Sequence, residues 1–144
     1  MAKLYELKTI FSEDGKLTVF EDLIPGAIRR VFYIYEAGQK VRGGHRHHRT
    51  WHALICMKGT CRIYTHDGSE EKEFWLVNPS QCLVLEPEDW HVMDGFSNDA
   101  ILLVISNQLY DKDDYIYEPY PTTRFTSERM SSLGTPSTSQ SVCG

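Results

Sequence analysis

The histidines of this chain are concentrated in one short segment, between Gly38 and Gly59. Four of the six lie there together with three arginines, so that the segment carries His45, His47, His48, His52, Arg42, Arg46 and Arg49. Imidazole exchanges protons near neutral pH, and guanidinium groups bind anions through charge-assisted hydrogen bonds. The composition therefore indicates a site that binds an anion and moves protons. Three or four imidazoles would also suit a transition metal such as zinc, iron, nickel or copper.

The spacing of His45 and His47 predicts that both rings point to the same face, because side chains alternate along an extended strand. Arg46 and His48 are then expected to point away. His52 requires the intervening loop to bring it back to that face. His91, on a separate strand later in the chain, is a further candidate for the same cavity.

Length and composition indicate one soluble domain. The chain has 144 residues, of which 41% are hydrophobic and 12% aromatic, enough to bury a core. A formal charge of -5 argues against nucleic-acid binding, and no apolar run is long enough to span a membrane. The four cysteines show no Cys-x-x-Cys spacing, and Cys56 and Cys61 are expected to be buried free thiols. With no signal peptide expected at the N-terminus, the prediction is a cytoplasmic protein.

Short strands separated by turns of Gly, Asn, Asp and Pro predict an all-β fold, an antiparallel sandwich or barrel. The expected strands are residues 4–10, 17–20, 30–35, 51–57, 61–65, 73–77, 81–85, 90–93 and 100–106. No amphipathic helix of ten or more residues is expected before residue 107. Residues 1–120 are predicted to form the domain, and residues 121–144 a flexible tail rich in Ser and Thr.

Two motifs resemble those of the cupin family. Gly38, His45, His47, His52 and Gly59 follow the first cupin motif, with histidine at position 52 where glutamate is usual. The string from Pro87 to His91 resembles a shortened second motif. The resemblance implies a single cupin domain, a double-stranded β-helix or jelly roll, with these side chains inside the barrel.

Longer strings are similar to those of the cupin-type sugar 3,4-ketoisomerases, which act on dTDP-4-keto-6-deoxyglucose. They are Arg42 to His47, Pro87 to His91, Tyr110 to Ile116, and the strand Arg30 to Ile34. The resemblance spans about residues 4–120. It implies a keto–enediol tautomerisation in deoxysugar biosynthesis that moves a keto group from C4 to C3 of a nucleotide-linked sugar. It implies no cofactor and no metal.

The same resemblance implies roles for individual residues. His45 matches the position of the base and His47 that of its partner acid or base. Arg42 matches a position suited to the nucleotide pyrophosphate, for which Arg30 is a second candidate. Trp90, next to His91, is expected to line the pocket and to stack on the nucleotide base.

Three positions depart from the family pattern. Asp14 stands where relatives carry Arg or Tyr facing the sugar, Phe32 replaces a tyrosine, and His52 replaces a glutamine. Tyr33 is the candidate that could supply the missing catalytic hydroxyl. These departures leave two alternatives open, a metal-dependent cupin such as a dioxygenase and a non-catalytic sugar-binding cupin.

The resemblance also implies an assembly. Family members are homodimers with exchanged N-terminal strands, and residues 4–10 are the segment expected to take that part here. The expected partners are thus a small-molecule nucleotide sugar and a second copy of the chain, with no nucleic acid and no membrane.

Overall fold

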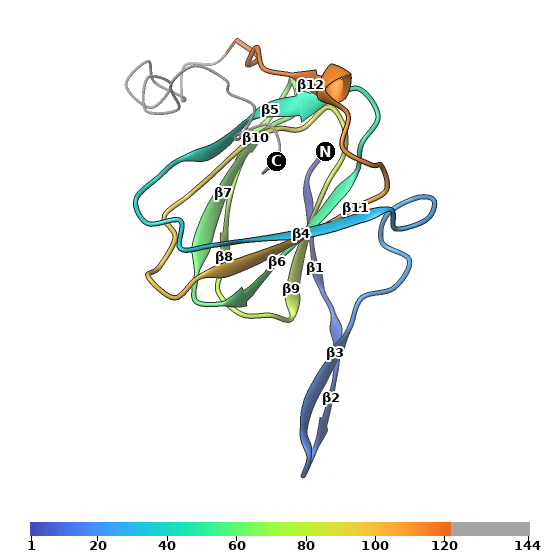
Figure 1. The fold of residues 1–144 in the computed structure, drawn as a ribbon, viewed down its shortest axis with the longest axis vertical. Helices are drawn as coiled ribbons and strands as arrows, with labels where there is room; N and C mark the ends of the chain where they lie inside the picture. Colours follow the sequence, from blue (N-terminus) through green and yellow to red (C-terminus); the bar gives the residue numbers. More distant parts are fainter. Residues whose placement is uncertain (122–144) are drawn as a thin grey trace.

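Two antiparallel five-stranded sheets face each other in the structure, a computed structural model that describes residues 1–121 (Figure 1). The first, called sheet I here, has the strand order β1 (Lys3–Glu6), β9 (Gln81–Leu85), β6 (His52–Lys58), β11 (Ile101–Ser106) and β4 (Arg30–Tyr35). The second, sheet II, has the order β12 (Tyr115–Ile116), β5 (Arg42–His47), β10 (Trp90–Asp94), β7 (Cys61–His66) and β8 (Glu71–Leu76). This is the predicted all-β cupin jelly roll, and the fold prediction is confirmed.

The core lies between the sheets. Leu54, Leu83 and Leu102 of sheet I pack in one buried cluster with Ile63 and Met93 of sheet II. Alternation along the strands produces this packing, because every second side chain faces the partner sheet. In β4 the exposed and inward residues alternate along the whole strand.

The central strands of sheet I are buried on both faces. Ala53 and Ile55 of β6 belong to a second cluster, on the outer face of the sheet. Leu7 and Ile24, from the N-terminal segments, help to cover them. The continuous apolar sequence of β6 follows from this double burial.

The N-terminal region differs from the prediction. The segment expected as one strand over residues 4–10 breaks at Leu7, which is buried. Residues before the break form β1, at the edge of sheet I, and residues after it form β2 (Lys8–Ser12), which pairs with β3 (Gly15–Val19). This β2–β3 hairpin projects away from the barrel (Figure 1). One strand therefore becomes two because a single apolar anchor divides it.

The C-terminal part of the described chain lies at the opposite end of the barrel from the hairpin. A 3₁₀ turn, η1 (Lys112–Asp114), leads into β12, which pairs with β5 (Figure 1). Residues 122–144, which include most of the predicted tail, lie outside the described residues. Cys56, Cys61 and Cys82 are buried free thiols, as predicted for the first two. Over residues 1–121 no helix has the length and apolar character needed to cross a membrane.

Candidate active site

Four buried histidines meet inside the barrel. His45 and His47 come from β5, His52 from the start of β6 and His91 from β10. The ring centroids of His45 are 5.1 Å from His47 and 4.9 Å from His91, and those of His47 and His52 are 4.7 Å apart. The predicted common face of His45 and His47 is therefore present, and His52 and His91 join it.

A β-bulge lets Arg42 share this face. Arg42 and His45 are three residues apart, so regular alternation would point them in opposite directions. The register between β5 and β10 shifts here: His45 pairs with His91, whereas Arg42 pairs with Met93. Directly paired residues share a face. Since His91 and Met93 both face the interior, Arg42 is placed on the interior side as well.

Glycine is required at position 43 of this bulge. Its φ of 86° lies in the left-handed region, where a side chain is strained. A Cβ there would also come within 2.9 Å of the backbone oxygen of His91. The pair Gly43–Gly44 thus has a geometric reason, which is to insert one residue between the arginine and the histidine.

Asp114 holds His47 in place. Its Oδ2 lies 3.0 Å from His47 Nδ1 and also accepts a hydrogen bond from the Thr50 hydroxyl. Its Oδ1 accepts a hydrogen bond from the Arg49 backbone N–H at 2.9 Å. Burial alone would raise the pKa of this carboxyl, but these hydrogen bonds and the nearby imidazole hold the pKa well below its usual range. The Asp114 side chain turns inward and is 2% exposed, so it is not a solvated turn residue.

These contacts define which ring nitrogens carry hydrogen. A carboxylate and a carbonyl oxygen only accept hydrogen bonds. His47 Nδ1 therefore donates to Asp114, and His91 Nδ1 donates to the backbone oxygen of Asp89 at 3.0 Å. In each neutral ring the lone pair is then on Nε2. His47 Nε2 is buried and has no hydrogen bond to any residue in the described part of the chain.

His52 is held neutral. Burial lowers its pKa well below the ordinary value, and positive charge on His47, His91 or Arg30 would lower it further. A neutral imidazole at this position can donate or accept a hydrogen bond without adding charge to the site.

Arg30 and Tyr115 border the cluster. The Arg30 guanidinium lies 4.4 Å from the ring centre of Phe32 and interacts with the Tyr115 hydroxyl. The Tyr115 ring packs 4.7 Å from His45 and 4.6 Å from His47. Burial raises the pKa of Tyr115 to about 12, against the opposing effect of Arg30, so the hydroxyl keeps its proton at neutral pH. Both predicted residues of β4, Arg30 and Phe32, thus lie on the inward side.

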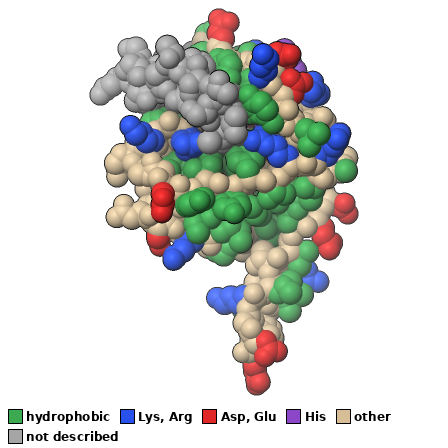
Figure 2. Space-filling model, in the orientation of Figure 1, with side chains coloured by type: hydrophobic (Ala, Val, Ile, Leu, Met, Phe, Trp, Pro, Cys, Tyr) green, Lys and Arg blue, Asp and Glu red, His purple; other side chains and the backbone are tan. Residues whose placement is uncertain are grey.

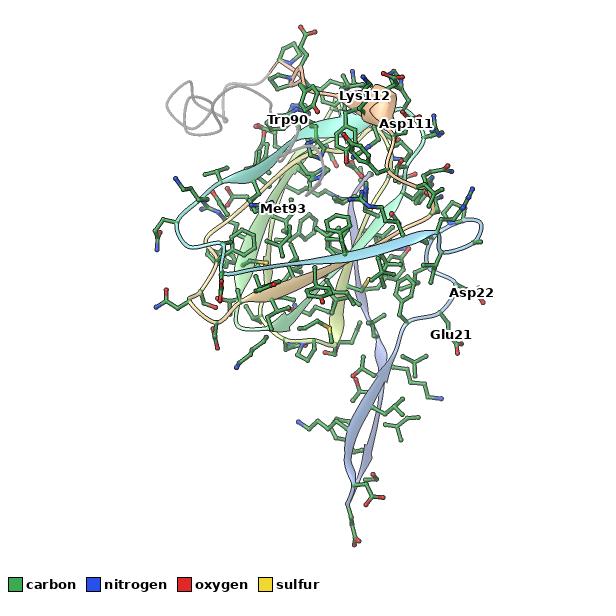
Figure 3. All side chains as sticks on the ribbon, in the orientation of Figure 1. Glu21, Asp22, Trp90, Met93, Asp111 and Lys112 are labelled. Atoms are coloured by element: carbon green, nitrogen blue, oxygen red, sulfur yellow. The ribbon has the colours of Figure 1, made fainter. Side chains whose placement is uncertain are left out.

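Three predicted site residues are not brought to the cluster. Tyr33 is 62% exposed on the outer face of β4 and stacks on Tyr35, because its neighbour Phe32 takes the inward direction. Trp90 is fully buried with Tyr64 and Val92 on the outer face of sheet II, because His91 takes the inward direction. Figure 3 shows Trp90 toward the end of the barrel that carries η1, and Met93 nearer the middle. Asp14 lies in the turn of the β2–β3 hairpin, at the far end of the molecule.

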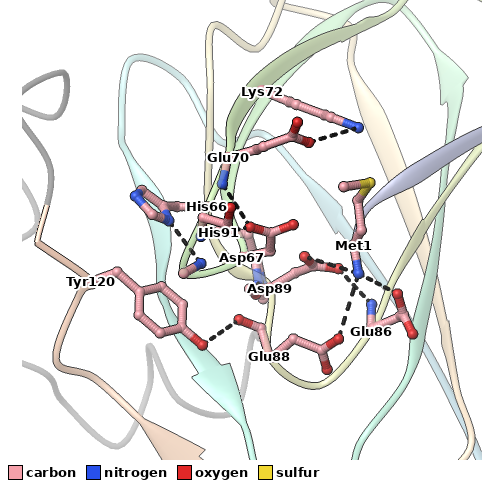
Figure 4. A network of polar contacts seen from close by, with 12 residues as sticks. Met1, His66, Asp67, Glu70, Lys72, Glu86, Glu88, Asp89, His91 and Tyr120 are labelled. Atoms are coloured by element: carbon pink, nitrogen blue, oxygen red, sulfur yellow. Dashed lines mark hydrogen bonds and ion pairs between the residues drawn. The ribbon is translucent and has the colours of Figure 1, made fainter.

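An acidic group supports the strand that carries His91. Asp89 is buried, and its Oδ2 accepts the Glu86 backbone N–H at 2.7 Å (Figure 4). The Met1 amino group contacts Glu86 and lies 3.7 Å from Asp89. Burial raises the pKa of the Asp89 carboxyl to about 6, against the effect of the Glu86 hydrogen bond. The turn before His91 is therefore held by polar contacts around the buried Asp89 carboxyl.

The described residues contain no group of three or more His, Cys, Asp or Glu side chains placed to hold a metal ion. What the site does contain is a set of neighbouring imidazoles, two of them with an assigned tautomer, beside an inward arginine. Such a set can remove a proton from one atom of a bound molecule and return one to another.

Two facing sheets with a histidine cluster between them define a cupin, and the comparisons with known proteins specify which kind. Residues 1–127 match the family described as WxcM-like, C-terminal (FdtA). The TDP-4-oxo-6-deoxy-α-D-glucose-3,4-oxoisomerase of Aneurinibacillus thermoaerophilus is 36% identical over 117 residues, 79% of this chain and 84% of that one. The chain belongs to this WxcM-like family of cupins, as the sequence motifs predicted.

Solved structures agree with this assignment. The TDP-fucose-3,4-ketoisomerase WlaRA of Campylobacter jejuni superposes with a TM-score of 0.75 at 33% identity, covering 81% of this chain and 89% of that one. A histidine-to-asparagine variant of the 3,4-ketoisomerase QdtA of Thermoanaerobacterium thermosaccharolyticum, in complex with TDP-4-keto-6-deoxyglucose, gives 0.75 at 34% identity. That match covers 81% of this chain and 87% of the QdtA chain.

Proposed function

We propose that the protein is a nucleotide-sugar 3,4-ketoisomerase that converts a dTDP-4-keto-6-deoxyhexose into its 3-keto isomer. The observation that carries the proposal is the pair His45 and His47, two buried imidazoles 5.1 Å apart on one inward face. Relatives that cover most of the chain carry the same activity in their names, with TDP-linked sugars as substrates.

The reaction needs two coupled proton transfers. In the first step His45 removes the proton from C3, while protonated His47 gives its Nε2 proton to the oxygen on C4. The electrons of the C3–H bond form the C3=C4 bond of an enediol. In the second step His47 takes the proton from the oxygen on C3, and His45 returns its proton to C4. The keto group is then on C3, and both histidines are as they began.

The rate enhancements expected from two placed histidines are those of an acid–base isomerase. General acid and general base catalysis each contribute about 10²–10⁴-fold when the group is placed and has a suitable pKa. Holding the sugar between two fixed imidazoles adds the advantage of orientation. No further group on the chain is needed to balance the protons.

Nucleotide binding is assigned to the arginines. Arg42 is half-buried, and its Nε is buried without a hydrogen bond to any described residue, so a donor is left for an incoming oxygen. Pyrophosphate oxygens are suited to guanidinium donors. Arg30, already interacting with Tyr115, is the second candidate. Trp90 is given no role in stacking on the nucleotide base, because its ring is buried on the outer face of sheet II.

The proposed assembly is a homodimer. The β2–β3 hairpin exposes Ile10, Phe11 and Leu17, at 48%, 70% and 58%. Figure 2 shows hydrophobic side chains on the hairpin and on the barrel face above it. Exposed apolar surface of this extent is typical of an interface. A second copy covering the hairpin would also place Asp14 against another barrel, and light scattering should give twice the 16.6 kDa of the chain.

A cytoplasmic location is part of the proposal. The three described cysteines are free thiols, and Cys56 and Cys61 are adjacent in the β6–β7 hairpin without forming a disulfide. Free buried thiols are typical of proteins in reducing compartments.

The test uses His45→Asn. The wild-type protein should exchange the C3 proton of dTDP-4-keto-6-deoxyglucose for deuterium in D₂O and move the keto group, both followed by NMR. The variant should lose the exchange yet still bind dTDP in calorimetry. His48→Asn, the same change at an exposed neighbour, is the control and should behave as wild type. Undiminished exchange in His45→Asn would refute the proposal; GDP- and UDP-linked 4-keto sugars define the nucleotide preference.

A further inference from the structure

The buried Asp114 carboxylate lies within hydrogen-bond distance of a ring of the histidine cluster, 3.0 Å from His47 Nδ1. Asp114 belongs to η1 and lies 67 residues after His47 in the sequence. Asp114 lies inside the string Tyr110 to Ile116, but neither the cupin motifs nor the charge pattern gave it a role.

We propose that Asp114 is a positioning residue: it holds the Nδ1–H of His47, so that Nε2 is the only nitrogen of that ring to exchange protons with the substrate. The inference rests on the proposed function for its catalytic consequence. Its structural content, the tautomer of His47, can be measured in the absence of any substrate.

A purely structural role does not account for the geometry. Capping of η1 is done by Asp111, whose side chain accepts the Asp113 backbone N–H at 3.0 Å. Asp114 instead turns into the barrel and accepts hydrogen bonds from three donors. The carboxylate is thereby fixed at both oxygens before it meets His47.

An exposed ion pair joins the same two segments. Arg49, whose backbone N–H binds Asp114 Oδ1, reaches back with its guanidinium to Asp111 Oδ2 at 2.7 Å. η1 is thus tied to the loop after β5 at two points. Turning the Asp114 carboxylate out of its plane would break hydrogen bonds from both Thr50 and Arg49, and these bonds keep one oxygen directed at His47.

The hydrogen bond to Asp114 decides which nitrogen of the His47 ring can exchange a proton. With Nδ1–H donated to Asp114, proton exchange is confined to Nε2, the buried atom that has no hydrogen bond within residues 1–121. The carboxylate also provides the opposite charge when His47 is protonated, as the first step of the proposed reaction requires. A ring free to adopt the other tautomer would present N–H where a lone pair is needed.

Asp114→Asn tests this with little change of shape. An asparagine can offer Nδ1 either its carbonyl or its NH₂ group, so both tautomers become possible and the charge is lost. Nitrogen-15 NMR of the substrate-free protein should show only the Nδ1–H form of neutral His47 in the wild type and a mixture in the variant. The kcat of isomerisation should fall about 10²-fold or more, with KM within about threefold.

Asp113→Asn is the matched control, because it makes the same change at the exposed adjacent residue. It should leave both the tautomer and kcat as in wild type. Retention of the pure Nδ1–H form in Asp114→Asn, or a kcat within threefold of wild type, overturns the inference. Should that variant not fold, Thr50→Val removes one donor to Asp114 and should lower kcat about fivefold; no change there overturns it equally.

The two proposals can fail separately. A wild-type protein that isomerises no nucleotide sugar would refute the proposed function. The NMR comparison would still decide whether Asp114 fixes the tautomer of His47.

Discussion

The bulge in β5 can be tested by replacing its first glycine, Gly43→Ala. A φ of 86° costs a non-glycine residue about 1–2 kcal/mol. The new Cβ would also lie 2.9 Å from the backbone oxygen of His91, closer than such atoms pack. Neither backbone can yield without moving β5 against β10, for which overpacking costs of about 1–3 kcal/mol are usual. The expected loss of unfolding free energy is therefore about 2–5 kcal/mol.

Gly38→Ala separates the two contributions. Gly38 has a φ of 62°, but a Cβ there meets nothing within 4 Å, so it bears only the conformational cost of about 1 kcal/mol. Urea unfolding at fixed protein concentration measures both variants, and calorimetry measures their affinity for dTDP. Gly43→Ala should be the less stable and should bind dTDP at least tenfold more weakly, because Arg42 and His45 lose their shared face. Equal stability and equal dTDP affinity in the two variants would refute the role given to the bulge.

Two further predictions concern pH and metals. Because the folded Asp89 carboxyl has a pKa of about 6 and the unfolded one about 3.9, its contribution to stability is greatest below pH 4 and is lost as pH rises through 6. Wild type should therefore lose up to about 3 kcal/mol relative to Asp89→Asn between pH 4 and 7 in urea unfolding; a constant difference between the two proteins would contradict this. Dialysis against EDTA should leave the isomerase activity unchanged, and activity that disappears on dialysis and returns with an added divalent metal would favour the metal-dependent alternative instead.

Most of the fold could be predicted because its signals are local. The structure leaves the limits of the expected strands 30–35 and 81–85 unchanged, as β4 and β9. It shifts the limits of others, such as β6 and β8, by one or two residues. The break at Leu7 was missed because an apolar residue fits an alternating strand equally well. Only contact with the second buried cluster shows that Leu7 is an anchor.

The site was predictable where it depends on neighbouring residues. Alternation placed His45 and His47 together, and the same rule excludes Tyr33 and Trp90 once Phe32 and His91 are known to face inward. The sequence alone could not choose which member of each pair turns in. The Gly43–Gly44 pair was the available signal for the bulge, since adjacent glycines inside a strand often mark one.

Asp114 was missed for a different reason. Its partner lies 67 residues away, and the charged string Asp111-Lys112-Asp113-Asp114 is typical of a solvated turn. The available hint was that Asp114 alone directly precedes the apolar pair Tyr115–Ile116, which returns the chain to β5. The contact could not be predicted because Asp114 and His47 are far apart in the sequence, not because their residue types are unusual.

The position of η1 imposes an order on the assembly of the site during synthesis. The pairings among β4 to β11 can form as soon as β11 has left the ribosome, because η1 and β12 take no part in them. His47 lacks its hydrogen-bond acceptor until Asp114 has been synthesised and β12 has paired with β5. Translation arrested just before Asp111 should thus yield a closed barrel that is chemically incomplete, and the final turn acts as the step that matures the enzyme.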